Sequence, residues 1–246
     1  MKISVAIITR NAAVELDRCL ASVVFADEIV VLDQESVDDT VEVCARHGAV
    51  LYQSDWLGFG PMKQKVVSLC RNRWILSIDS DEEVTPELQA AIMALPDEPV
   101  EAAFTVNRLS RFLGKWIRHC GWHPDHVLRI FDRQRAGFND KPVHESVETE
   151  GTVGKLPGLL KHYTYETMEQ YIDKLNRYTT LAAEQMHTDG RTANLWQALV
   201  RSKVTFWRMF ILQGGILDGW AGAVLCWSSG FSVLSKYVKL WRMRNP

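Results

Sequence analysis

Residues 1–99 alternate short apolar runs with helical patterns, and this alternation limits the fold more than any other feature of the chain. The apolar runs are rich in Ile, Val and Leu, as buried strands are, and lie at residues 3–8, 28–32, 49–52 and 74–78. Helical spacing or helix boundary residues occupy 14–23, 38–47 and 61–70, and Thr85-Pro86 begins a further helix. This order predicts an α/β fold with a parallel sheet and right-handed crossovers.

Polar side chains stand where the expected strands end, and parallel sheets bind ligands at that edge. They are Thr9, Asn11, Asp33, Asp79 and Asp81. Asp79 and Asp81 follow a buried run at i and i+2, so two like charges lie close together. A divalent cation shared with substrate phosphates would remove the repulsion. The alternative is an acidic turn before Thr85, but the position facing Asp33 favours the metal.

The remainder of the chain divides into two parts. In residues 100–165, glycines, histidines and aromatic residues interrupt the pattern, which predicts a mixed sheet with loops that build a pocket. Residues 166–188 have the apolar stripe of an amphipathic helix. We therefore expect a catalytic domain at 1–165, with halves 1–99 and 100–165, and a helical extension at 166–246.

Charge is unevenly distributed along the chain. The formal net charge is −2, but residues 191–246 carry eight basic groups and one acid, Asp218, and hold five of the nine tryptophans. The extension is therefore +7 and residues 1–190 are −9. Residues 219–235 lack charge but contain four serines, so a segment lying on an anionic membrane surface is favoured over a spanning helix. A helical pair packed on the catalytic domain, or a dimer contact, is the alternative.

The cysteines point to a reducing compartment. Five are scattered through the chain without a Cys-x-x-Cys pair, which argues against a disulfide framework or a zinc ribbon. The N-terminal apolar run is too short for a signal peptide and predicts a strand. No nucleic-acid-binding motif accompanies the basic extension. These features predict a cytoplasmic protein that does not bind nucleic acid.

Three segments together resemble family 2 glycosyltransferases with the GT-A fold. They are Val5-Ala-Ile-Ile-Thr-Arg-Asn11, then Val30-Val-Leu-Asp33 with Ser36, Asp38 and Thr40, and then Asp79-Ser-Asp81. The resemblance is nearest to bacterial lipopolysaccharide-core enzymes of the β-glucosyltransferase type. It continues through residues 58–60, 112–116, 121–125, 128–131, 142–145, 160–163 and 215–219. The chain departs from that pattern at Ala12, at Glu35, where a small residue is usual, and at Lys63-Gln64, where Arg-Asn is usual.

The resemblance implies an inverting hexosyltransferase that depends on a divalent cation, Mg²⁺ or Mn²⁺. The donor would be UDP-glucose and the acceptor a heptose of the lipopolysaccharide inner core. The enzyme would act as a peripheral protein on the inner face of the bacterial inner membrane. The alternatives are transfer to a polyprenyl phosphate carrier, which shares the fold, and a non-catalytic nucleotide-sugar-binding membrane protein. The sequence leaves the oligomeric state open.

The resemblance assigns the donor side to residues near the strand ends. Thr9 and Asn11 would line the nucleotide pocket, where Asn11 could instead serve the turn. Asp33 would accept a hydrogen bond from uracil or ribose, or cap its own turn. Ser36 and Asp38 would shape that loop or act as helix caps. Lys63 is a candidate cation for the diphosphate, or else a solvated helix lysine.

The remaining candidate residues are assigned to metal binding and to the acceptor side. Asp81 would be the main metal ligand, with Asp79 at the metal or the ribose, and His162 completing the site unless it is a core histidine. Inverting transfer needs a carboxylate base. Glu145 is the first candidate, and a surface carboxylate is its alternative role. His144 would orient Glu145 or contact the acceptor.

Three further residues belong to the acceptor side. Asp125 is the rival base, or a turn residue paired with Arg129. Trp122 would stack on a sugar, or only pack. Arg129 would bind an acceptor phosphate, unless it pairs with Asp125.

Overall fold

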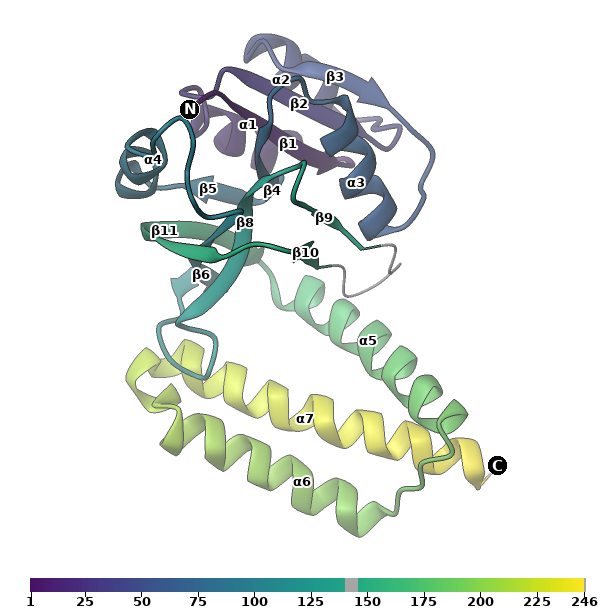
Figure 1. Ribbon diagram of the computed structural model, residues 1–246. Coiled ribbons are helices and arrows are strands. Elements are labelled where there is room, and N and C mark those ends of the chain that lie inside the picture. Colours follow the sequence, from purple (N-terminus) through teal and green to yellow (C-terminus); the bar gives the residue numbers. More distant parts are fainter. Residues whose placement is uncertain (140–145, 246) are drawn as a thin grey trace. The chain divides into compact units, whose positions relative to one another are not determined.

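The computed structural model describes residues 1–139 and 146–245 and divides into two compact units (Figure 1). The first unit comprises Met1–Arg108 and Asp125–Tyr163, and the second comprises Leu109–Pro124 and Thr164–Pro246. Residues 109–124, expected in the catalytic domain, thus belong to the helical unit.

The parallel half of the first unit follows the predicted alternation. Its strands are β1 (Ile3–Thr9), β2 (Glu28–Asp33), β3 (Val50–Gln53) and β4 (Trp74–Asp79), in the order β3-β2-β1-β4. The helices are α1 (Ala13–Ala21), α2 (Thr40–Arg46), α3 (Phe59–Leu69) and α4 (Pro86–Met93). Thr85 caps α4 by accepting a hydrogen bond from the backbone N–H of Leu88, as its position before Pro86 predicts.

Both faces of this half are covered, which explains why its strands are continuously apolar. Val5 and Ile7 pack in one cluster with residues of α1, α2 and α4, whereas Ala6, which points the other way, packs with α3 (Figure 1). The register pairs Thr9 with Asp33 and Ile8 with Asp79. The strand ends that the sequence singled out therefore meet at one edge.

The antiparallel half extends the sheet beyond β4. Its strands are β8 (Asp125–Asp132), β6 (Ala103–Phe112), β11 (Val153–Tyr165) and β5 (Glu82–Val84), in that order. The short β7 (Lys115–Trp116) pairs with β6, and β9 (Ala136–Phe138) pairs with β10 (Val147–Thr149). The expected mixed sheet at 100–165 is confirmed, but its strands are longer than their apolar runs suggested and β5 was not foreseen.

The second unit is built around three long helices, α5 (Met168–Thr188), α6 (Leu195–Trp207) and α7 (Gly219–Arg244). Thr167 and Gln170 form a capping box at the start of α5. A turn of π-helix, η1 (Arg208–Leu212), and one of 3-10 helix, η2 (Gly215–Asp218), connect α6 to α7. No single helix of the described chain is long and apolar enough to cross a membrane, although α6–η1 and η2–α7, bent by 72°, reach that length and composition together.

Candidate functional site

The loops after β1 and β2 are joined by hydrogen bonds at the carboxyl edge of the sheet. The buried Asp33 carboxylate accepts the Ser36 backbone N–H at 2.9 Å and its hydroxyl at 2.5 Å. Asn11, with φ of 47°, donates its N–H to Ser36 Oγ at 2.7 Å, and Asn11 Oδ1 accepts from Val37 N at 2.8 Å. Thr9 Oγ1 is buried and has no hydrogen-bond partner among residues 1–139 and 146–245. A buried hydroxyl of this kind is a natural contact for a ligand.

Asp38 connects the starts of two helices. Its carboxylate accepts the hydroxyl of Thr40 at 2.5 Å and the backbone N–H of Ala13 at 3.1 Å. The Thr40 hydrogen bond, more than the others, lowers the pKa of Asp38. Glu35 in the same loop has φ of 48°, which a small residue adopts more easily. Asp33, Ser36 and Asp38 therefore all hold the loop in place by hydrogen bonds, as expected for Ser36 and Asp38.

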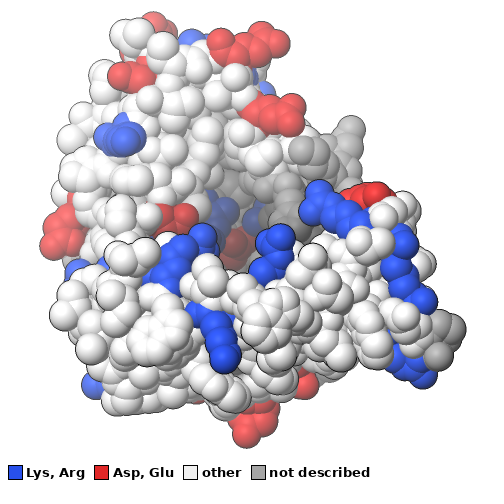
Figure 2. Space-filling model, turned by 90° about the horizontal axis from the view of Figure 1, so that it is seen from below, with Lys and Arg blue, Asp and Glu red and all other residues white. Residues whose placement is uncertain are grey.

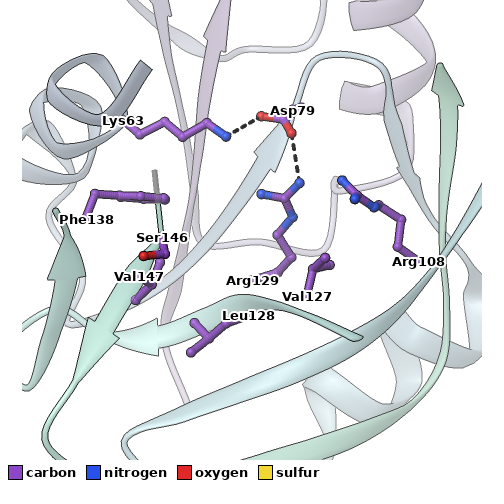
Figure 3. Close-up of a pocket in the computed structure, with 9 residues that line it drawn as sticks. All are labelled: Lys63, Asp79, Arg108, Val127, Leu128, Arg129, Phe138, Ser146 and Val147. Atoms are coloured by element: carbon purple, nitrogen blue, oxygen red, sulfur yellow. Dashed lines mark hydrogen bonds and ion pairs between the residues drawn. The ribbon is translucent and has the colours of Figure 1, made fainter. Parts of the chain in front are cut away.

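Asp79, at the end of β4, lies between two cations (Figure 3). Lys63 Nζ from α3 is 2.8 Å from Oδ1, and Arg129 Nη2 from β8 is 2.8 Å from Oδ2. Burial alone would raise the pKa of Asp79, but the charges of Arg129 and Lys63 hold it well below its usual range. Lys63 is buried, so the alternative of a solvated helix lysine is wrong. Its neighbour Gln64 accepts the Phe138 N–H and so holds β9 beside α3.

Glu82 is a buried carboxylate that the sequence did not single out. Arg129 Nη2 is 2.6 Å from its Oε1 and Arg108 Nη1 is 3.6 Å away, while Glu82 Oε2 accepts the Asp79 N–H at 3.0 Å. Burial alone would lower the pKa of Arg129, but the charges of Glu82 and Asp79 raise it above its usual value. Asp125 pairs with Arg108, at 2.9 Å from Nε and 2.8 Å from Nη2. The Asp125–Arg129 pair, which was the alternative role of both residues, is therefore wrong, because each residue has another partner.

A cavity of about 330 Å³ opens beside Asp79 within the first unit. Figure 3 shows the nine residues that line it: Lys63, Asp79, Arg108, Val127, Leu128, Arg129, Phe138, Ser146 and Val147. Three of these residues are cations, and each is paired with a carboxylate: Lys63 with Asp79, Arg129 with Asp79 and Glu82, and Arg108 with Asp125 and Glu82. Arg108 and Phe138 were not singled out in the sequence, because neither lies in a recognisable motif.

Asp81 and His162 come together from distant parts of the chain. His162 Nε2 on β11 is 3.3 Å from Asp81 Oδ2, and the backbone N–H of Tyr163 donates to Asp81 O at 2.9 Å. A carboxylate beside an imidazole suits Mn²⁺, and Mg²⁺ or Mn²⁺ commonly takes its other ligands from substrate phosphates and water. No group of three or more His, Cys, Asp or Glu able to hold a metal occurs in the described part of the chain. The residues present thus fit a cation that is shared with a phosphate ligand.

The other acceptor-side candidates are dispersed. Trp122 lies in the second unit, in edge contact with Phe112 at 6.1 Å between ring centroids and tilted against Tyr165 at 6.4 Å. These contacts fit the packing role. His144 and Glu145 lie outside the described residues.

Comparisons with known proteins agree on one family. The sequence model of glycosyl transferase family 2 matches residues 4–149, more than half of the chain. The chain is 26% identical to the lipopolysaccharide core biosynthesis glycosyltransferase LpsC of Rhizobium meliloti, over 96% of this chain and 93% of that protein. It is 27% identical to an uncharacterized glycosyltransferase of Rickettsia prowazekii, over 99% of this chain and 87% of that protein.

The solved structures agree on the fold. S. aureus TarS 1-349 in complex with UDP-GlcNAc has a TM-score of 0.50 and 13% identity, covering 100% of this chain and 92% of that one. A longer TarS structure, also with a TM-score of 0.50, is matched over 40% of its length. The expected GT-A fold with C-terminal helices is confirmed.

Proposed function

The chain belongs to glycosyl transferase family 2, and we propose that it transfers a hexose, with inversion, from a UDP-sugar to a heptose of the lipopolysaccharide inner core. UDP-glucose is the first candidate donor. The relative LpsC, which aligns over nearly its whole length, supports the core acceptor. The observation that carries the proposal is the pairing of Asp81 with His162 at 3.3 Å. It brings two suitable metal ligands together two residues beyond the end of β4.

The nucleotide half of the donor would occupy the edge at β1 and β2. The unpartnered Thr9 hydroxyl and the buried Asp33 carboxylate offer hydrogen bonds to the base and ribose there. That TarS was solved with UDP-GlcNAc supports a uridine donor. Asp81 and His162, with Asp79 nearby, would hold Mg²⁺ or Mn²⁺, which stabilises the charge that develops on a departing diphosphate.

The buried cations keep Asp79 ionised and in position. Lys63 and Arg129 together fix both of its oxygens, so Asp79 can only accept hydrogen bonds from a ligand hydroxyl. The ammonium of Lys63 lies in the same cavity and adds positive charge where a diphosphate is expected. In a site shielded from water such a charge acts more strongly than it would at the surface.

One carboxylate must take the proton of the acceptor hydroxyl. Arg108 donates two N–H groups to Asp125 Oδ2, so only the other oxygen remains for an acceptor. Glu145, oriented by His144, is therefore the base in this proposal. Arg129 contacts Asp79 and Glu82 through Nη2 alone, and its buried Nε has no partner among the described residues, so Arg129 stays the candidate contact for an acceptor phosphate.

The direct test is product analysis with purified protein. UDP-glucose, UDP-galactose and UDP-GlcNAc are each offered with a heptose-terminated core oligosaccharide or with polyprenyl phosphate, and products are identified by mass spectrometry and NMR. We expect one glucose in β-linkage on heptose from the α-linked donor. Product on polyprenyl phosphate alone would establish the carrier alternative. Absence of any product with every pair would support the non-catalytic one.

A further inference from the structure

The connection between α6 and α7 displays large apolar side chains to solvent. We call residues 207–220 the hairpin tip. Six of its large apolar side chains are exposed, including Leu212 at 81% and Leu217 at 71%. The others are Trp207, Ile211, Ile216 and Trp220. Isolated exposed apolar residues are ordinary, but six within fourteen consecutive residues form a patch that calls for a partner.

Small residues on the inner side of the hairpin explain why the large ones face outward. A Cβ at Gly222 would lie 2.0 Å from Gly215 O, and one at Gly230 would lie 3.0 Å from Ser202 O. The helices therefore pack closely through glycine, and Ala221 and Cys226 are buried alongside. Bulky residues on this side would separate the helices.

Three large apolar residues of the hairpin face inward. Leu225 is buried, and Phe206 and Phe210 pack against the core that contains Phe112 and Leu225. The exposed apolar surface of the hairpin is densest at the tip, and it continues along the helices at Trp196, Val204 and Trp227.

The single acid of residues 191–246 contributes almost nothing to the exposed charge. The Asp218 side chain is 6% exposed and accepts the backbone N–H groups of Arg118 and His119, at 3.2 Å and 2.9 Å. His119 Nδ1 lies 2.9 Å from the same carboxylate. The exposed charges of this segment are basic, among them Arg201, Lys203 and Arg208. Figure 2, a view from below, shows Lys and Arg side chains scattered over a largely uncharged surface.

We propose that the hairpin tip docks into the surface of a bilayer that contains anionic phospholipid. Leu212 and Leu217 enter the acyl region, and Trp207 and Trp220 lie at the level of the headgroups, where indole rings are favoured. The exposed basic residues contact lipid phosphates. A membrane fits this surface better than a second copy of the chain, because two copies would bring the same basic residues together.

Vesicle sedimentation with the full chain tests the proposal. Vesicles of phosphatidylethanolamine and phosphatidylglycerol are compared with vesicles of phosphatidylcholine alone. We expect binding to the anionic vesicles with a blue shift of tryptophan fluorescence. Leu212→Asp/Leu217→Asp should weaken it at least tenfold, and Arg201→Glu/Lys203→Glu should weaken it and remove its salt dependence. The matched control Val24→Asp/Val100→Asp replaces residues 67% and 83% exposed on the first unit and should bind as the unaltered chain does.

Two results would overturn the proposal. One is equal vesicle binding by the tip variant and the control variant. The other is no vesicle binding together with a dimer, detected by light scattering, that the tip variant loses, which would make the tip a contact between copies. Circular dichroism checks that each variant is folded. Transfer to a soluble core oligosaccharide, measured in parallel, should be unchanged in the tip variant, so failure of the proposed activity and failure of membrane docking are distinguishable.

Discussion

Arg129→Met should destabilise the first unit strongly, because it removes the guanidinium that lies between the buried Glu82 and the partly buried Asp79. Asp79 keeps Lys63 at 2.8 Å, but Glu82, 0% exposed, keeps only Arg108 at 3.6 Å. Removing one partner of a buried ion pair costs roughly 3–5 kcal/mol. The remaining cations place the expected cost near the lower figure, about 3 kcal/mol. With a urea m-value of about 2 kcal/mol/M, the unfolding midpoint should fall by roughly 1.5 M.

Urea unfolding followed by circular dichroism measures this change. Arg46→Met is the matched control, because it removes an equivalent side chain from a pair with Asp17 in which both partners are largely exposed. It should leave the unfolding midpoint nearly unchanged, because exposed ion pairs contribute little to stability. Adding Glu82→Gln to Arg129→Met should recover part of the loss, since no buried charge is then left unpaired. Equal costs for Arg129→Met and Arg46→Met would refute the reasoning.

Three further predictions concern the base, a glycine and the pH. Glu145→Gln should abolish transfer and leave UDP-glucose binding by calorimetry intact, whereas near-normal turnover in that variant with loss in Asp125→Asn would reverse the base assignment. Gly158→Ala should lower the free energy of unfolding, measured by thermal unfolding, by at least about 2 kcal/mol, because φ there is 91° and a Cβ would lie 2.4 Å from Leu88 N. The control Gly48→Ala should cost less, because its Cβ would meet nothing within 4 Å. Because the folded pKa of Asp79 is depressed, its contribution to stability is present above about pH 4 and is lost as pH falls, so Asp79→Asn should flatten acid unfolding curves.

The parallel half was predictable because its signals are local. Continuous apolar runs with intervening helices specify parallel strands, and parallel strands place their carboxyl ends together. Thr9 opposite Asp33 in the register follows from that rule. Thr85-Pro86 fixed the start of α4 in the same way, through capping chemistry within one turn.

The charge network was not predictable because its partners come from distant strands. Glu82 follows Asp81 in a sequence that resembles a solvated acidic turn, and its burial depends on Arg129, 47 residues away. The antiparallel return of β8 beside β4 creates that contact, and no local pattern encodes it. Likewise, the sequence showed that the extension is basic and rich in tryptophan, but only packing decides that Leu225 faces inward while Leu217 faces solvent.

Calorimetry of UDP-glucose binding tests the central claim most directly. The claim is that the edge beyond β4 holds the donor through a cation at Asp81 and His162. We predict binding that requires Mn²⁺ or Mg²⁺, that disappears in Asp81→Ala and weakens in His162→Ala, and that persists in Asp17→Ala, a control at a largely exposed carboxylate on α1. Unchanged, metal-independent binding in Asp81→Ala would contradict the account.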